Sequence, residues 1–223
     1  MHHRTNRLRQ ILFIILTTLV LFEAVLRLMG LRSMVLYESD PAAGYRLKPS
    51  QSVRVMGNDM TINRWGVRDP RALDTRPEGI PRILVLGDSV TWGGPRIQQE
   101  ELFTSALEQL DAVEAINAGV NGYSVAQMAA LYTAHLQELE PDILLVYAIP
   151  RDFERAPIVR LTHDSVVFPM NTPRFAIEAA WGLLRLQAGR RLGWAWIEGP
   201  PPTASPDGLA PGQECIPLNI QAL

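Results

Sequence analysis

A short stretch of the chain combines residue types that could carry out nucleophilic chemistry. Residues 83–86 form an unbroken apolar run, and Gly87, Asp88 and Ser89 follow it directly. The apolar run predicts a strand that is buried on both faces. Ligands bind beyond the carboxyl ends of parallel strands, and a following helix offers free N–H groups to an oxyanion, so Ser89 suits a nucleophile. Gly-Asp-Ser is also common turn chemistry, so the tripeptide alone equally fits a simple strand end.

The residues around this serine resemble a known family. Residues 87–93, G-D-S-V-T-W-G, match the first motif block, G-D-S-x-T-x-G, of the SGNH or GDSL-type hydrolase superfamily. The resemblance implies that Ser89 is the nucleophile of an ester hydrolase and that its N–H helps to form the oxyanion hole. It also implies a supporting role for Asp88, next to the nucleophile.

Two later blocks of the family are matched in part. Residues 117–122, N-A-G-V-N-G, resemble the second block, whose glycine N–H is an oxyanion donor, and Gly119 takes that position. A glycine here could instead serve only a tight strand-to-helix turn. The third block, G-x-N-D, corresponds to residues 149–152, I-P-R-D, where only Asp152 matches. Arg151 replaces the donating asparagine, and it is either an altered third donor or an ordinary surface residue.

The family's general base, a histidine in a C-terminal D-x-x-H block, has no counterpart in this sequence. His135 falls in a predicted helix, where we expect a packed or surface residue. His163 is a possible substitute, although it precedes the last predicted helix. A serine without a base is a poor nucleophile. The resemblance covers about residues 8–155, so we expect a C-terminally truncated member of the family.

Strands and helices alternate in the part of the chain that contains these blocks. The sequence predicts buried strands over residues 83–86, 115–117 and 143–149, and helices over residues 100–110, 124–139 and 173–187. Ser124 and Gln127 have capping-box spacing, and Thr172 is the expected N-cap of the last helix. This alternation predicts an α/β fold with a parallel sheet and right-handed crossovers. The resemblance implies an incomplete, flavodoxin-like sheet with flanking helices.

The N-terminus carries a candidate membrane anchor. Residues 11–22 form an uncharged, mainly apolar run after three arginines, and only Glu23 and Arg27 add charge before residue 30. No convincing cleavage site follows, so the pattern favours an uncleaved, single-pass signal anchor in the lipid bilayer. The arginines favour a cytoplasmic N-terminus, with the rest of the chain in the periplasm or outside the cell. A buried amphipathic helix is the alternative.

Composition limits the remaining possibilities. The 223 residues, with 47% hydrophobic residues and a net charge of −2, suit one domain with appendages and offer no basic surface for nucleic acid. One cysteine and four scattered histidines give no metal-ligand spacing, and we expect no cofactor. The expected segments are a signal anchor (1–30), an irregular lead-in (31–81), a partial α/β domain (82–198) and a Pro/Gly-rich tail (199–223).

Within the lead-in, the sequence predicts a small hairpin over residues 53–63. Asn63 and Arg68 lie in a segment that resembles the one preceding the catalytic domain in membrane-anchored members of the superfamily. The two residues either face the active site or pin the lead-in to the rest of the protein. The composition of residues 71–81 indicates a polar, proline-bounded linker.

The leading hypothesis is a membrane-anchored serine ester hydrolase that faces the envelope. Ser89 would form an acyl-serine with an ester-bearing small molecule, or with an O-acyl group on an envelope glycan. The first alternative is an O-acyltransferase, which passes the acyl group to a sugar hydroxyl. The second is a catalytically inactive binding homologue, which Arg151 and the missing D-x-x-H block favour.

Overall fold

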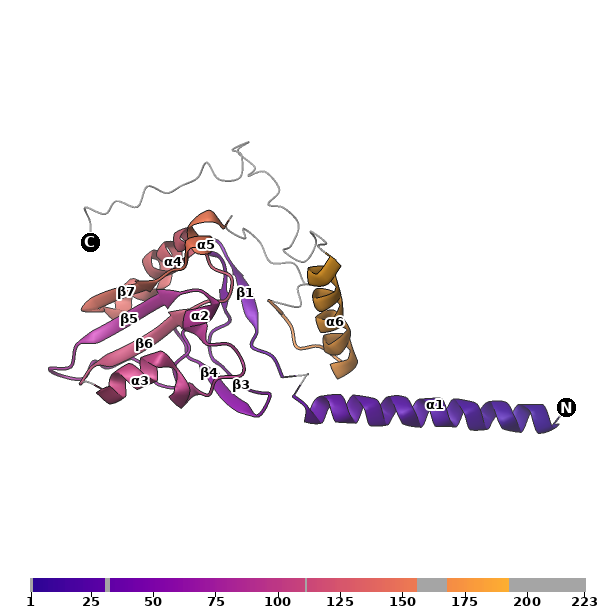
Figure 1. The fold of residues 1–223 in the computed structure, drawn as a ribbon. Helices are drawn as coiled ribbons and strands as arrows, with labels where there is room; N and C mark the ends of the chain where they lie inside the picture. The colour runs from indigo at the N-terminus through magenta and orange to yellow at the C-terminus, as the bar shows by residue number, and fades with distance from the viewer. Residues whose placement is uncertain (1, 31–32, 111, 156–167, 193–223) are drawn as a thin grey trace.

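A three-stranded parallel sheet is the centre of the molecule (Figure 1). The computed structural model describes residues 2–30, 33–110, 112–155 and 168–192. The strands are β5 (Arg82–Gly87), β6 (Glu114–Gly119) and β7 (Ile143–Tyr147), in the order β6-β5-β7. Gly87 at the end of β5 pairs with Gly119 on one side and with Tyr147 on the other. The carboxyl ends of all three strands therefore meet at one edge, as the predicted parallel sheet requires.

Helical segments connect the strands on both sides of the sheet. Between β5 and β6 lie α2 (Ser89–Trp92), the 3₁₀ turn η1 (Gln99–Glu101) and α3 (Phe103–Leu110). Between β6 and β7 lie α4 (Val125–Leu131), the π turn η2 (Tyr132–Leu136) and the 3₁₀ turn η3 (Gln137–Leu139). The predicted capping box of Ser124 and Gln127 is confirmed at the start of α4. The crossover from β5 to β6 and the crossover from β6 to β7 run in opposite directions across the sheet, and they place α3 and α4 on opposite faces (Figure 1).

The lead-in is more regular than the sequence indicated. It contains two antiparallel hairpins, one of β1 (Tyr37–Asp40) and β2 (Gly44–Leu47), the other of β3 (Gln51–Val55) and β4 (Asn58–Ile62). The second hairpin was predicted, and the first was not. Arg68 then pairs through its backbone with Ile62 and with Asn117, so the lead-in covers the outer edge of β6.

The hairpins and the sheet share one hydrophobic core. The buried rings of Tyr45 in β2 and Tyr123 before α4 meet edge to face, 5.1 Å apart at 79°. The Tyr45 hydroxyl also donates a hydrogen bond to the Asn121 carbonyl at 2.7 Å. The boundary expected between residues 81 and 82 therefore does not divide the core.

The third strand differs from its prediction as a buried strand. β7 is an edge strand, and Ile143, Leu145, Val146 and Tyr147 are 38–48% exposed. Leu144 alone in this strand packs against the core. An unbroken apolar run shows what a strand could bury, but its exposure depends on which other segments cover it.

Two long helices lie at the end of the molecule away from the sheet (Figure 1). α1 (His2–Leu28) contains the segment Arg9–Leu28, which is long and apolar enough to cross a membrane. α6 (Ala176–Leu192) lies crosswise to the carboxyl end of α1. It begins after the predicted start at residue 173 and is not capped by Thr172, because Glu23 of α1 accepts hydrogen bonds from its first N–H groups. The predicted tail, residues 199–223, lies outside the described residues.

Candidate functional site

Ser89 lies where the sequence predicted, directly beyond the carboxyl end of the central strand. It is the first residue of α2, and it is exposed. Asp88 is the buried N-cap of this helix, and its Oδ1 accepts the Val90 N–H at 2.9 Å. The Ser89 hydroxyl donates to Asp88 Oδ2 at 3.2 Å. Asp88 therefore supports both the turn and the orientation of the serine hydroxyl.

Two glycines allow α2 to cross the ends of the strands at close range. A Cβ on Gly87 would overlap the side chain of Thr91, and a Cβ on Gly119 would lie 2.7 Å from the Thr91 carbonyl carbon and still closer to the Trp92 nitrogen. Real Cβ atoms do not approach backbone atoms this closely. The sequence places glycine at the end of two paired strands because α2 occupies the space that a side chain would need.

Asn117 fastens α2 to β6. The side chain is buried, its Nδ2 donates to the Thr91 carbonyl at 2.7 Å, and its Oδ1 accepts the Gly119 N–H at 3.0 Å. Gly119 was expected to offer this N–H to an oxyanion, together with the N–H of Ser89. In the structure the Gly119 N–H already has an acceptor, so the expected donor is occupied. The identity of Gly119 is explained by the close approach of α2.

A second glycine of the same loop has a backbone N–H that could serve as a donor. Gly122 follows three residues after Gly119 and adopts a left-handed conformation, with φ of 83°. Among the described residues, neither its N–H nor the N–H of Ser89 has a hydrogen-bond partner. The loop leaves β6 next to the end of β5, where the Val120 N–H donates to the Gly87 carbonyl at 3.0 Å. The signal in the sequence was Asn121-Gly122, a dipeptide typical of tight turns.

Arg68 holds the chain that follows α2. Its guanidinium is fully buried and donates to the carbonyls of Trp92, Gly94 and Ile97 at 2.8, 2.9 and 2.6 Å. Burial lowers the pKa of Arg68 to about 10. Of the two roles considered from the sequence, these contacts show the pinning role, because three donors of Arg68 serve backbone carbonyls.

Asn63 also serves the backbone of the lead-in. Its Nδ2 donates to the Arg71 carbonyl at 2.9 Å, and its Oδ1 accepts the Trp65 N–H at 2.9 Å. The side chain is buried. Asn63 therefore fixes the turn after β4.

Asp152 and Arg151 belong to α5 (Pro150–Glu154), the short helix after β7. Asp152 is buried, and its Oδ2 accepts the Ile149 N–H at 3.0 Å, while its Oδ1 lies 3.7 Å from the Arg155 guanidinium. These contacts brace the start of α5, so they give Asp152 a structural role. Arg151 is exposed on the same helix.

His135 lies far along the crossover that leads away from Ser89. Its Nε2 is 2.6 Å from Asp40 Oδ2, at the end of β1. Shortly after it, the Leu139 carbonyl accepts a hydrogen bond from Arg82, at the start of β5. The crossover runs opposite to the strands, so His135 lies toward the amino-terminal edge of the sheet, where it cannot serve Ser89. His163 lies outside the described residues, and within them no group of three metal-ligating side chains occurs.

The Asp40 carboxyl links the first hairpin to this crossover. Its Oδ1 accepts the N–H groups of Ala42 and Ala43 at 3.0 and 2.7 Å. Burial acts to raise the pKa of Asp40, but the hydrogen bonds from Ala43 and His135 outweigh burial, and the pKa lies below its ordinary value.

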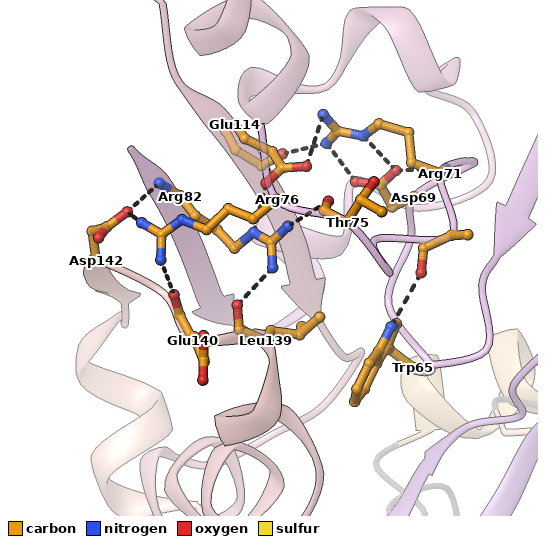
Figure 2. Close-up of polar contacts among 12 residues, drawn as sticks. Trp65, Asp69, Arg71, Thr75, Arg76, Arg82, Glu114, Leu139, Glu140 and Asp142 are labelled. Carbon is orange, nitrogen blue, oxygen red and sulfur yellow. Dashed lines mark hydrogen bonds and ion pairs between the residues drawn. The ribbon is translucent and has the colours of Figure 1, made fainter. Parts of the chain in front are cut away.

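The amino-terminal edge of the sheet is fixed by a network of arginines and carboxylates (Figure 2). The buried Arg82 donates to Glu114 Oε2 at 2.5 Å and to the Leu139 carbonyl at 2.7 Å. Arg76 pairs with Asp142, just before β7. Arg71 and Arg76 of the expected linker therefore join Arg82 of β5 in a network that connects the starts of all three strands, which a simple linker would not do.

Comparison with models of known protein families and with curated protein sequences found no match to this chain.

Proposed function

We propose that this chain is a membrane-anchored serine ester hydrolase of the SGNH type, with Ser89 as its nucleophile. The observation that supports it is the exposed Ser89 hydroxyl in the first turn of α2, directly beyond the central strand. Across the sheet, the second strand of the chain lies beside the first, and the third lies on the other side of the first, which is the strand order at the start of a flavodoxin-like sheet. Ligands in such sheets bind at the switch point outside the first and third strands, and Ser89 follows the first.

The chemistry would be acyl transfer through an acyl-serine. The Ser89 oxygen attacks the ester carbonyl carbon, the bond to the alcohol oxygen breaks, and the alcohol leaves with a proton. Water then attacks the acyl-serine, which releases the acid and restores the Ser89 hydroxyl. Asp88 orients the hydroxyl, and the N–H groups of Ser89 and Gly122 are the candidate donors to the developing oxyanion.

The substrate class follows from the anchor. With α1 in the bilayer and the arginines before it in the cytoplasm, the sheet would lie in the envelope, where O-acylated glycans and other carboxylic esters are found. Fusing reporter proteins after Gly79 tests this orientation. We expect a periplasmic reporter to be active and a cytoplasmic one to be silent, and the reverse result would refute the orientation.

A second candidate function is ester binding without turnover. It is favoured by the Gly119 N–H, which is bonded to Asn117, and by His135, which is bonded to Asp40 away from Ser89. Under this reading the loops around Ser89 hold an ester group, but no base removes the serine proton.

The test is hydrolysis of p-nitrophenyl acetate by the full chain in detergent, with mass spectrometry of the peptide that contains Ser89. Removing one member of a serine triad leaves ~10³–10⁴-fold catalysis over water. We therefore expect slow turnover that Ser89→Ala abolishes, and an acetyl group on Ser89. Ser52→Ala is the matched control, because Ser52 is an exposed serine on β3. The activity of this variant should equal that of the unchanged chain.

Three results separate the candidates. Equal rates for the unchanged chain and Ser89→Ala, with no acetylated Ser89, would refute the hydrolase. Saturable binding of an ester analogue under those conditions would then support the binding function. Fast, Ser89-dependent turnover would show that a base is present, and His163→Ala would be the first variant to examine.

A further inference from the structure

α6 carries an exposed apolar stripe. Ile177, Trp181 and Leu184 are 40, 62 and 57% exposed, and they are spaced by four and three residues, which places them on one face of the helix. Ala176 and Ala179, which are 0% and 5% exposed, turn toward the rest of the protein. The large side chains of α6 therefore point outward, and the small ones point inward, which is the reverse of a helix that covers a core.

Arginines flank this apolar stripe. Successive residues of a helix are about 100° apart, so Arg191 falls on one side of the stripe and Arg185 on the other. Both side chains are exposed. Glu178 lies on the Arg185 side, where its carboxylate accepts the N–H groups of Arg174 and Phe175 before the helix. An apolar face bordered by arginines is typical of helices that lie in the surface of a membrane, where the long side chains reach the headgroups.

Glu23 joins the start of α6 to the membrane-spanning candidate. Its two carboxylate oxygens accept the N–H groups of Ala176 and Ile177 at 2.8 and 3.1 Å, and it also pairs with Arg27 at 2.7 Å. Glu23 precedes the end of α1 by five residues, which is ~7.5 Å along a helix. A span beginning at Arg9 crosses ~30 Å of hydrocarbon by about residue 29, so the start of α6 lies ~9 Å below that boundary, which is within the ~5–10 Å to which an interfacial helix buries its apolar face.

We propose that α6 lies in the surface of the bilayer that α1 crosses, with the Ile177–Trp181–Leu184 stripe inserted below the headgroups. This inference rests on the proposed insertion of α1. α6 lies crosswise to the carboxyl end of α1 (Figure 1). If α1 crosses the bilayer, α6 therefore runs parallel to the membrane plane. Tryptophan is enriched at that depth, and Arg185 and Arg191 meet anionic headgroups. The occupant of the stripe is thus a lipid surface.

The test measures the depth of single labels in the full chain. Cys215→Ser removes the only cysteine, and Trp181→Cys then carries an environment-sensitive fluorophore in vesicles of phosphatidylcholine and phosphatidylglycerol. We expect quenching by spin-labelled lipids and protection from aqueous iodide. Leu184→Cys repeats the measurement in case the first variant does not fold. Gln187→Cys, an exposed residue about 120° away from Trp181 on the same helix, should remain open to iodide.

A label at Leu16→Cys, in the middle of α1, separates the possible failures. Lipid quenching at residue 16 with iodide access at residues 181 and 184 would overturn the proposal and leave the insertion of α1 intact. Iodide access at all of these positions would overturn both. Protection of residue 181 from iodide that increases with the protein-to-lipid ratio, without quenching by spin-labelled lipids, would show that a second copy covers the stripe. This result would also overturn the proposal. Ester hydrolysis by each labelled variant reports on Ser89 independently.

Discussion

The residues next to Ser89 are fixed mainly by the need to hold α2 on the sheet. Gly119 leaves room for the backbone at Thr91 and Trp92, and Asn117 bonds both to Thr91 and to Gly119. Any catalytic role of the loop is therefore added to a packing requirement. This explains why a glycine at the end of β6 is not by itself a sign of an oxyanion donor.

Gly119→Ala should destabilise the protein. The added methyl meets backbone atoms of Thr91 and Trp92 that cannot move without shifting α2. Overpacking of this kind costs ~1–3 kcal/mol. Chemical denaturation in detergent measures the loss, and Val90→Ala is the control, because this exposed residue on α2 should change stability by less than ~0.5 kcal/mol. A Gly119→Ala variant as stable as the unchanged chain would contradict the close approach of α2.

Arg68→Met should also destabilise the protein. The substitution leaves the carbonyls of Trp92, Gly94 and Ile97 without their donor. The Trp92 carbonyl is buried and the other two are part-buried, and a buried group left unpaired costs ~1–3 kcal/mol, so we expect a loss of about 2–4 kcal/mol in the free energy of unfolding. Arg54→Met is the matched control, because the Arg54 side chain is 71% exposed and its ion pair is long, at 3.9 Å. Equal effects of the two variants would show that Arg68 does not hold this loop.

At the scale of elements, the crossover from β6 to β7 does more than connect two strands. It starts with the capping box at Ser124, passes through a π turn, and carries His135 to the Asp40 carboxylate of the first hairpin. The turn end of the hairpin is thus fixed by two contacts, one from the Tyr45 hydroxyl to the loop after β6 and one from the Asp40 carboxylate to His135.

The Asp40 contact should make stability depend on pH. The pKa of Asp40 is lowered in the folded protein, so its contribution is present above the unfolded value of ~3.9 and is lost as the pH falls through the folded pKa. We expect Asp40→Asn to destabilise the protein most above about pH 5, and the difference from the unchanged chain to shrink toward pH 3. Thermal unfolding across this range measures it.

Asp59→Asn provides the comparison, because the Asp59 side chain is 81% exposed. Its difference from the unchanged chain should stay near zero at every pH. A constant difference for Asp40→Asn across the range would contradict the lowered pKa.

The sequence could predict the elements whose signals are local. The strand before Ser89, the hairpin around Gly57 and the cap at Ser124 all depend on neighbouring residues, and all three are confirmed. The β1–β2 hairpin was missed because its stabilising contacts, such as Tyr45 with Tyr123, are far apart in the chain. The acceptor of the Gly119 N–H likewise depends on a side-chain orientation that residue spacing does not reveal.

At the scale of the molecule, the two edges of the sheet differ. The outer edge of β6 pairs with the backbone at Arg68, whereas β7 carries four exposed apolar side chains at the other edge. Exposed apolar edge strands pair readily with other chains. This edge is therefore where we expect self-association of the chain to begin.

Val146→Lys should reduce self-association. Val146 is 48% exposed on β7, and a lysine on an edge strand opposes pairing with another strand. We expect a smaller average mass by light scattering in detergent, with little change in thermal unfolding. Met56→Lys is the control, since Met56 is 49% exposed at the tip of the β3–β4 hairpin and should leave the mass unchanged. Equal masses for the chain and Val146→Lys would show that β7 is not the contact.

The short connection between α1 and β1 has a kinetic consequence. α1 ends at Leu28 and β1 begins at Tyr37, so residues 29–36 can span at most ~28 Å. If α1 spans the bilayer as proposed, the protein diffuses in two dimensions and samples only a thin layer next to the lipid. Esters anchored in that layer would meet Ser89 at a high effective concentration, while esters in the surrounding solution would meet it only after diffusing to the membrane.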